Sequence, residues 1–346
     1  MTISFEKSKL PLIWKKSSVT PIFKKGDKLN PLNYRPISLL SVPSKVMEAK
    51  VVDEMTNFLT KHAIIPREQH GFVAGRSTTT NLLHYLNDWT RAYDLKIPND
   101  VIYLDFAKAL DRVTARRLIY KLEYIGVRGN LLFWIRDYLS RRTFTVRVGA
   151  AFSTERLVIS GVPQGSVLGP FLFLVFVSDL AHHIKSRKSF YADDTKLYAN
   201  PFTDSYVLQQ DLNALNQWCG DWLLPLNVEK CVMLHIGTNN PSTQYFIDGR
   251  VLSAVSSHMD LGLIVTSDLT WSLIYLLRKS FVHLSFASSI TLYKSCVRPI
   301  LEYAGAVWCP VFVRDKNILE SVQRRAARMC SGNFRHLTKK GWQEPI

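Results

Sequence analysis

The chain has 346 residues, 47% of which are hydrophobic, and a formal net charge of +16 at pH 7. The apolar fraction is sufficient for a folded core, which excludes an intrinsically disordered or collagen-like chain. A large excess of Lys and Arg is typical of proteins that bind a polyanion, with nucleic acid as the first candidate and a membrane surface as the second. The length corresponds to roughly two to three domains or subdomains.

The sequence contains no apolar run long enough to span a bilayer, since the longest candidate, residues 168–177, is short and contains a Gly-Pro pair. Charges at Glu6, Lys7 and Lys9 interrupt the region where an export signal needs an apolar segment. The five cysteines form no C-x-x-C pair, so the sequence supports neither a disulfide framework nor a zinc site. We therefore expect a soluble, intracellular chain with no membrane partner.

The predicted elements fall into three regions. Residues 1–99 are rich in Pro and Lys as far as Arg35 and then have helical periodicity. Residues 100–236 alternate strand-like runs with helical segments, which predicts an α+β block. Residues 237–346 contain short strand-like runs around two glycines and then further helical segments. The expected helices lie at 114–125, 131–140, 203–223, 287–300 and 316–330, and the expected short strands surround Gly249 and Gly262.

Two adjacent aspartates, Asp193 and Asp194, lie between two strand-like runs in the segment FYADDTKLY. The pattern predicts a β-hairpin with the acidic pair at its tip. Two-residue hairpin turns favour Asn-Gly or Asp-Gly, and neighbouring carboxylates repel each other. An Asp-Asp pair is therefore costly at this place unless a cation binds there, and an ordinary exposed acidic turn is the alternative interpretation.

A third carboxylate, Asp105, ends the apolar run VIYLD. A carboxylate at the end of a buried strand needs a partner. Three carboxylates from two adjacent strands can hold a pair of Mg²⁺ ions, which prefer oxygen ligands, and two metal ions support in-line phosphoryl transfer. The alternative is that Asp105 caps the helix that follows. Asp111 suits that structural role better, so we assign it no catalytic function.

The segment SGVPQGSVLGP, residues 160–170, contains three glycines at four-residue spacing. Its prolines exclude a continuous apolar helix, and no Gly-Lys-Ser/Thr follows to form a phosphate-binding loop. We expect a backbone that comes close to a ligand, with Gln164 offering both a donor and an acceptor. A plain turn before a buried helix is the alternative.

Taken together and in this order, seven stretches resemble a reverse transcriptase, and their residues are most similar to those of the jockey-like group of non-LTR retrotransposons. A co-linear set of seven is specific, whereas the four residues YADD alone would be weak. The stretches are VTPIFKKGDKLNPLNYRPISLL, QHGFVAGRSTTTNLL, VIYLDFAKALDRV, SGVPQGSVLGP, YADDTKLY, LNVEKC and LYKSCVRPILEYAGAVW. The resemblance implies an α+β right-hand polymerase with fingers (1–99), a ferredoxin-like palm with finger insertions (100–236), and a primer-grip hairpin with a partial helical thumb (237–346).

The resemblance also implies roles for individual residues. Asp105, Asp193 and Asp194 would bind two Mg²⁺ ions, with Mn²⁺ as the alternative, and Lys230 would protonate the leaving pyrophosphate. For Lys230 a solvated lysine is the competing interpretation, and for Arg76 it is a surface or phosphate-backbone arginine. The residues expected to contact the incoming nucleotide are Arg76, Phe106, Leu110, Gln164 and Gly165, and those expected to contact the template or primer are Arg35, Lys45, Leu261 and Gly262.

The chain departs from the family's pattern in three places. Leu110 stands where the family has an aromatic side chain, which predicts weaker exclusion of a 2′-hydroxyl. A helical stretch that the family carries is missing between Trp271 and Arg278, which predicts an incomplete thumb and weak processivity. An upstream endonuclease domain and further C-terminal sequence are also missing, as expected for a polymerase-domain fragment.

The leading hypothesis is an RNA-directed DNA polymerase that uses deoxynucleoside triphosphates to extend a DNA primer on an RNA template. Its resemblance to elements that use chromosomal primers implies a nuclear location. A catalytically inactive, truncated remnant that binds nucleic acid is the alternative from another class, and an RNA-templated RNA polymerase is a third possibility. Mg²⁺-dependent extension and a comparison of the two sugar types distinguish these hypotheses.

Overall fold

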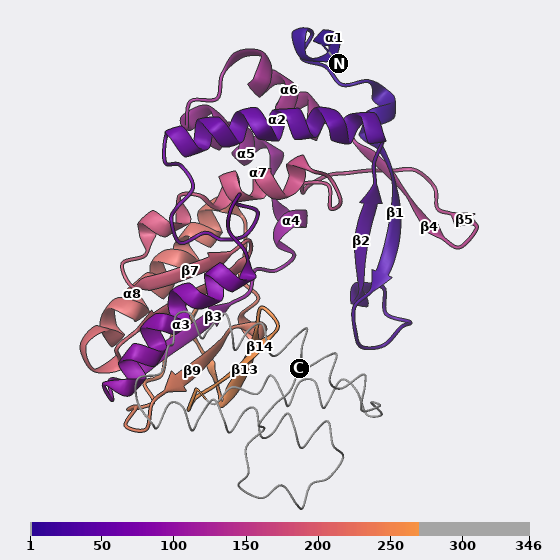
Figure 1. The fold of residues 1–346 in the computed structure, drawn as a ribbon. Helices are drawn as coiled ribbons and strands as arrows, with labels where there is room; N and C mark the ends of the chain where they lie inside the picture. The colour runs from indigo at the N-terminus through magenta and orange to yellow at the C-terminus, as the bar shows by residue number, and fades with distance from the viewer. Residues whose placement is uncertain (1, 270–346) are drawn as a thin grey trace, which may run out of the picture. The chain divides into compact units, whose positions relative to one another are not determined.

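The computed structural model describes residues 2–269 and shows the arrangement drawn in Figure 1. Contacts divide the chain into two compact units, Met1–Ser256 and Ser257–Ile346. Of the second unit, residues 257–269 are described here. The helices expected at 287–300 and 316–330, and with them the predicted thumb, lie outside the described residues.

The first unit is built on a sheet of five strands, with the order β12-β9-β3-β8-β7. The strands are β3 (Asn99–Leu104), β7 (Arg187–Tyr191), β8 (Asp194–Ala199), β9 (Val232–Ile236) and β12 (Ser253–Val255). Strand β3 runs antiparallel to both of its neighbours, β8 and β9, and β7 runs antiparallel to β8. Four strands in the spatial order fourth, first, third and second along the chain, with helical connections, form the ferredoxin-like palm. The predicted α+β fold is confirmed.

Both faces of this palm sheet are covered by helices. Apolar residues of α8 (Pro201–Trp222) and α7 (Leu168–Val177) share one core cluster with the β3 and β8 side chains of one face. Residues of α3 (Thr78–Asp94) contact the opposite face, where Trp89 meets the ring of Tyr198 edge-on. Because successive strand residues point to opposite faces, a strand covered on both sides is apolar throughout. Strand β3 is accordingly buried at every position.

A layer of helices extends the palm core, with α2 drawn across α5 and α7 in Figure 1. Helix α2 packs against α7, α5 packs against both α6 and α7, and α1 packs against α6. The buried carboxylate of Glu48 in α2 accepts hydrogen bonds from the backbone nitrogens of Val167 and Leu168 at 2.9 and 3.2 Å. This carboxylate stabilises the otherwise unpaired N-terminus of α7. The helices are α1 (Thr2–Glu6), α2 (Val42–Lys61), α4 (Ala109–Arg112), α5 (Ala115–Tyr124) and α6 (Gly129–Leu139), with short 3₁₀ helices η1 (Leu12–Lys15), η2 (Pro31–Asn33), η3 (Leu180–His183) and η4 (Val228–Lys230).

A second sheet joins the N-terminal segment to a later part of the chain. Its strands are β1 (Lys16–Phe23), β2 (Tyr34–Leu39), β4 (Thr143–Val148), β5 (Ala151–Phe152) and β6 (Arg156–Leu157). The expected helical character beyond Arg35 was wrong for β2. Pro21 and Pro36 are paired in the β1–β2 register, and proline weakens a strand signal because it removes a ladder donor.

The short strands expected around two glycines are confirmed. Strands β10 (Phe246–Ile247) and β11 (Arg250–Val251) form a hairpin around Gly249 in the first unit. In the second unit, β13 (Ser257–Asp260) and β14 (Leu263–Thr266) form a hairpin around Gly262. Among residues 2–269, no helix combines the length and the apolar character that crossing a membrane requires.

Candidate active site

The acidic hairpin lies between β7 and β8 at the edge of the palm sheet. Tyr191 pairs with Asp194, so the two turn residues are Ala192 and Asp193, and Asp194 is the first residue of β8. The prediction that both aspartates lie at the tip is therefore corrected by one position. Ala192 has φ +57°, which is the left-handed conformation that L-residues other than glycine rarely adopt. Asp193 is half-buried, whereas Asp194 is exposed.

Asp105 follows β3 directly and lies beside this hairpin. The β3–β8 register pairs Leu104 with Thr195. Continued by one residue, the same antiparallel register brings Asp105 next to Asp194. The backbone carbonyl of Asp105 accepts a hydrogen bond from Asn227 at 2.7 Å, which ties the end of the strand to the segment before η4. The three carboxylates expected to act together thus come from two adjacent strands.

The charges of the two aspartates on either side of this pairing influence each other. Burial raises the pKa of Asp193 above its ordinary value, and the charge of Asp105 raises it further. The positive charges of Arg35 and Lys24 act in the opposite direction. Burial and the nearby negative charge both disfavour the ionised form of Asp193, and nearby cations favour it.

Lys230 provides one such cation. Its Nζ lies 3.2 Å from Oδ2 of Asp105, and the side chains of Lys230 and Asp105 are 65% and 36% exposed. Lys230 is the last residue of η4, and Cys231 separates it from β9. The next residue, Cys231, is buried beside the Asp105 backbone, and burial raises the pKa of its thiol to about 11. Cys231 therefore remains a neutral packing residue, and a proton-transfer role for Lys230 stays a prediction.

The donor chemistry of these carboxylates fits a hard divalent cation. Among the described residues, no group of three or more His, Cys, Asp or Glu side chains is arranged to hold a metal ion by itself. Mg²⁺ does not require such a cage, because it keeps several waters and usually binds one or two carboxylates together with substrate phosphates. The coupled pair of Asp105 and Asp193, with Asp194 adjacent, meets this requirement.

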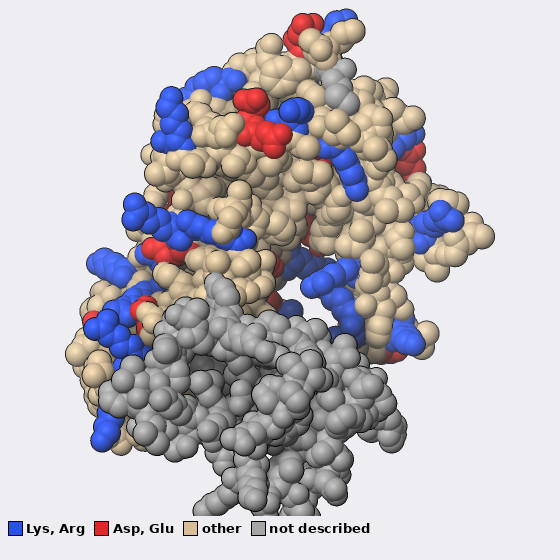
Figure 2. Space-filling view, in the orientation of Figure 1, with Lys and Arg blue, Asp and Glu red and all other residues tan. Residues whose placement is uncertain are grey.

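Two cations from the N-terminal sheet, Lys24 and Arg35, also influence Asp193 electrostatically. Lys24 follows β1, and Arg35 lies on β2, opposite Ile22. Partial burial lowers the pKa of Lys24, the charges of Arg35 and Lys230 lower it further, and Asp111 and Asp105 raise it. Figure 2 shows Lys and Arg side chains bordering the hollow next to β1 and β2. Lys24 was missed in the sequence, where only its place in the basic run FKKGDK marks it.

The glycine-rich segment lies against α4 and β2. Gln164 donates a hydrogen bond from Nε2 to Oδ1 of Asp111 at 2.6 Å, and its carbonyl accepts one from Ser38 at 2.7 Å. A Cβ on Gly161 would lie 2.8 Å from the Asp111 backbone, and one on Gly165 would lie 2.6 Å from the Ser38 carbonyl. Both glycines also have positive φ. Close approach to other backbone segments explains these glycines without a ligand, and contact of Gln164 and Gly165 with a nucleotide stays a prediction.

The structure places Arg76 in a loop that supports the palm. Its Nη1 donates to the carbonyl of Arg67 at 2.7 Å and also to the carbonyl of Gln69. The guanidinium therefore holds the loop before α3 together, which is a structural role that neither interpretation of the sequence considered. Contact with a triphosphate stays a prediction for Arg76.

The remaining predicted residues occupy different settings. Phe106 is 4% exposed and belongs to the core, so its side chain lies under the site. Leu110 is half-buried in α4, and its carbonyl accepts a hydrogen bond from Val162. Lys45 is half-buried in the first turn of α2. In the second unit, Leu261 and Gly262 form the β13–β14 turn, both with positive φ.

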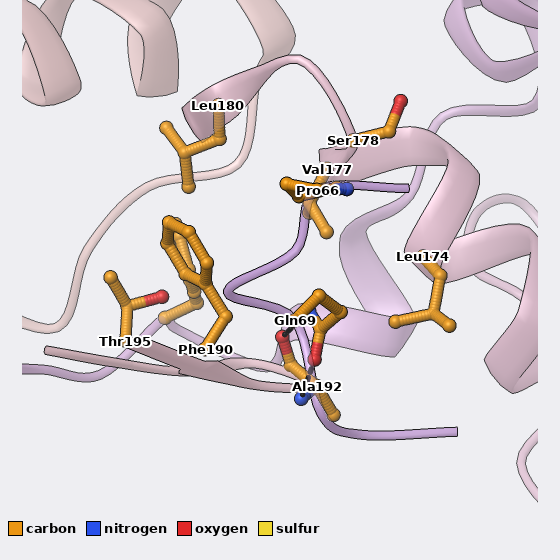
Figure 3. Close-up of a pocket in the computed structure, with 10 residues that line it drawn as sticks. Pro66, Gln69, Leu174, Val177, Ser178, Leu180, Phe190, Ala192 and Thr195 are labelled. Carbon is orange, nitrogen blue, oxygen red and sulfur yellow. Dashed lines mark hydrogen bonds between the residues drawn. The ribbon is translucent and has the colours of Figure 1, made fainter. Parts of the chain in front are cut away.

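A small cavity lies behind the catalytic turn. Its lining includes Phe106, Gln69, Phe190 and Ala192, and Figure 3 shows Gln69 directed towards Ala192. The cavity volume of about 10 Å³ is at the lower limit for a single water molecule. A nucleotide cannot enter this space.

Comparison with known proteins agrees with this geometry. A family model described as reverse transcriptase (RNA-dependent DNA polymerase) matches residues 22–266. The probable RNA-directed DNA polymerase from transposon BS of Drosophila melanogaster is 32% identical over 92% of this chain and 38% of its own length. The RNA-directed DNA polymerase from mobile element jockey of the same organism is 28% identical, over 93% and 38%. The chain thus spans about two fifths of the length of these relatives.

Solved structures show the same fold at low sequence identity. Telomerase from Candida albicans, in complex with a fragment of telomeric RNA, matches with a TM-score of 0.53 and 13% identity, covering 97% of this chain and 59% of its own. Apo telomerase from Candida tropicalis, truncated from its C-terminal domain, has a TM-score of 0.52 and 14% identity, covering 76% and 55%. The relatives confirm the resemblance to jockey-like elements. The chain belongs to the reverse transcriptase (RNA-dependent DNA polymerase) family.

Proposed function

We propose that this chain is an RNA-directed DNA polymerase that extends the 3′-hydroxyl of a DNA primer on an RNA template with deoxynucleoside triphosphates. The observation that carries the proposal is the position of Asp105 beside the Asp193–Asp194 turn at the end of the palm sheet, with Nζ of Lys230 3.2 Å from Asp105. Acidic residues bind metal ions, and cations attract a triphosphate. Family membership supports the same reaction.

The residues divide the work according to their charge. Asp105, Asp193 and Asp194 would hold two Mg²⁺ ions, which when bound neutralise charge on the transferring phosphoryl group and orient the attacking hydroxyl. Lys24 and Arg35, from the N-terminal sheet, would bind the triphosphate oxygens. Lys230, exposed and already beside Asp105, would supply the proton that the leaving pyrophosphate takes up.

The remaining assignments belong to the same proposal. Gln164, Gly165 and Leu110 would lie along the sugar and base of the nucleotide, and the smaller Leu110 would discriminate less strongly against ribonucleotides. Lys45 and the Leu261–Gly262 turn would contact template and primer.

The family's elements prime at chromosomal DNA, so a nuclear location would follow from the same proposal. The position of a fluorescent fusion of the chain in the cell tests it.

A second candidate function is nucleic-acid binding without catalysis. It is favoured by the Lys and Arg side chains next to β1 and β2 (Figure 2), because they attract nucleic-acid phosphates whether or not the carboxylates hold metal ions. A protein of this kind would retain the basic surface next to β1 and β2 and would bind template and primer with the steep salt dependence of phosphate contacts. It would not extend the primer.

Primer extension by the folded chain tests the proposal. The assay uses an RNA template with a DNA primer and compares Mg²⁺ with EDTA and the wild type with Asp193→Asn. We expect extension to fall by at least about 10³-fold in the variant, since metal-binding carboxylates carry most of the rate. Binding of the hybrid should change little.

The matched control is Asp248→Asn, an exposed aspartate with φ +51° in the β10–β11 turn. Asn tolerates this conformation, so folding and extension should be unaffected. Extension by Asp193→Asn at the wild-type rate would contradict the metal assignment. A wild type that binds the hybrid without extending it would favour the second candidate, and faster incorporation of ribonucleotides on RNA would favour an RNA polymerase.

A further inference from the structure

The loop between α2 and α3 adds an edge to the palm sheet beside the catalytic hairpin. The backbone nitrogen of Phe190 in β7 donates to the carbonyl of Glu68 at 3.0 Å, and the nitrogen of His70 donates to the carbonyl of Phe190 at 2.9 Å. Gln69 and Phe190 form a parallel bridge between these bonds. Residues 68–70 are therefore fixed against β7 just before it turns.

The side chain of Gln69 contacts the turn itself. Its Oε1 accepts hydrogen bonds from the backbone nitrogens of Ala192 at 2.9 Å and Gly71 at 2.8 Å, and its Nε2 donates to the Ala192 carbonyl at 3.3 Å (Figure 3). Gln69 is 3% exposed. One buried amide thus pairs with both backbone groups of Ala192, the turn residue with φ +57°.

The loop that carries Gln69 is itself held in place. A Cβ on Gly71 would lie 2.3 Å from the backbone nitrogen of Ala192, so only glycine allows this approach. Arg76 donates to the carbonyl of Gln69, and His70 Nδ1 lies 2.9 Å from Thr80 Oγ1 in α3. The amide of Gln69 therefore acts from a fixed support.

We propose that Gln69 is a positioning residue that holds Ala192 in the left-handed conformation and thereby sets the direction of the Asp193 carboxylate. Positive φ costs free energy for an alanine, so contacts with other residues must hold Ala192 in this conformation. Asp193 is the next residue, so the φ and ψ angles of Ala192 determine where its carboxylate points relative to Asp105. The catalytic consequence rests on the proposed polymerase function, whereas the contact with the turn does not.

The test uses Gln69→Met, which keeps the approximate side-chain volume and removes all three hydrogen bonds. We expect kcat of primer extension to fall roughly 100-fold, because a small misplacement of a reacting group costs about that factor. KM for the deoxynucleotide should change by less than about threefold, since Gln69 does not touch the substrate. Hydrogen–deuterium exchange of peptides that cover residues 187–195 should become faster.

The chain offers a matched control. Gln209 in α8 makes the same pair of bonds to Phe246, donating to its carbonyl at 2.9 Å and accepting from its nitrogen at 2.9 Å, at a hairpin remote from the acidic residues in sequence. Gln209→Met should leave kcat and exchange in 187–195 unchanged. Equal losses of kcat in both variants would show a general folding effect and overturn the proposal.

Adding Ala192→Gly to Gln69→Met should restore kcat only if Gln69 acts by holding the conformation of Ala192. Glycine adopts positive φ without steric cost, so it should restore part of kcat in the Gln69→Met background. If Gln69→Met does not fold, Gln69→Asn replaces it, because the amide stays neutral and polar but is too short to pair with both backbone groups of Ala192. A reduced kcat with faster exchange at the turn supports the proposal, and unchanged values overturn it.

The two readouts separate this inference from the proposed function. If the wild type does not extend primers, the proposed function fails, and hydrogen exchange alone decides whether Gln69 holds the turn. Faster exchange confined to 187–195 in Gln69→Met then supports the positioning role. Unchanged exchange overturns it, whatever the activity of the wild type.

Discussion

The palm sheet and the N-terminal sheet contribute opposite charges to one site under opposite conditions of burial. Strand β3 is buried at every position, and β8 is buried at all positions after Asp194. Strands β2 and β4 contain half-buried and exposed positions only. The acidic residues thus lie at the end of a buried core, whereas Lys24 and Arg35 belong to a sheet whose strands are mostly half-buried or exposed. Under the proposed function, precise geometry is needed at the carboxylates, and approximate charge is sufficient at the cations.

Replacing Asn81 has the largest expected effect on stability, and it tests whether the palm sheet is held firmly by α3. Asn81 donates to Ser189 Oγ and the Phe190 carbonyl at 2.8 and 2.9 Å and accepts from the buried Nζ of Lys196 at 3.1 Å. Asn81→Ala leaves these buried groups without that partner, so we expect about 3 kcal/mol lower unfolding free energy. Urea denaturation measures it. Asn87→Ala, an exposed position of the same helix, is the control. A loss below about 1 kcal/mol at Asn81 would show that the α3 face of the palm is not rigid.

The buried Lys121 predicts how the stability of the core depends on pH. It is 3% exposed, lies 2.6 Å from Asp179 and 3.5 Å from the Trp222 ring centroid, and burial lowers its pKa from 10.5 to about 8, against the opposing effect of Asp179. Between these values the unfolded chain binds more protons than the folded chain. Stability from this group therefore rises as pH increases from 8 to 10.5.

The measurement compares the unfolding free energies of wild type and Lys121→Met at pH 7.5 and 9.5. We expect the difference to move by about 2 kcal/mol in favour of the wild type at the higher pH. Subtracting the variant removes the contribution of tyrosines whose pKa burial raises, such as Tyr198. A difference that does not change with pH would mean that Lys121 titrates as an exposed lysine does.

The smallest expected effect concerns the exposed cations. Lys24→Ala should raise KM for the deoxynucleotide about three- to tenfold with little change in stability, because the cation attracts phosphate from a partly solvated position. Steady-state kinetics measures it. Lys25→Ala is the matched control, since Lys25 is the adjacent exposed lysine and does not appear among the charges that influence Asp193. Equal effects of both variants would indicate a diffuse basic surface in place of a defined phosphate site.

The sequence analysis identified those parts of the site whose local patterns are strong. The run VIYLD and the hairpin FYADDTKLY have the periodicity and apolar content of palm strands, and β3, β7 and β8 lie there. The paired prolines of β1 and β2 concealed the N-terminal hairpin, and with it the electrostatic influence of Lys24 on Asp193. Gln69 was not identified because its hydrogen bonds with the turn join residues that are 123 positions apart along the chain.

The sequence by itself determined the α+β class and marked Asp105, Asp193 and Asp194 as the candidate metal-binding residues, because strand periodicity, charge and motif order are local properties. Only the tertiary structure decided that Ala192 occupies the turn in a left-handed conformation, that Gln69 holds it there, and that Arg76 supports a loop. These features depend on the register of β3 with β8 and on the pairing of residues 68–70 with β7. Long-range pairing of this kind is fixed by the packing of the whole core. A local sequence pattern therefore does not reveal it.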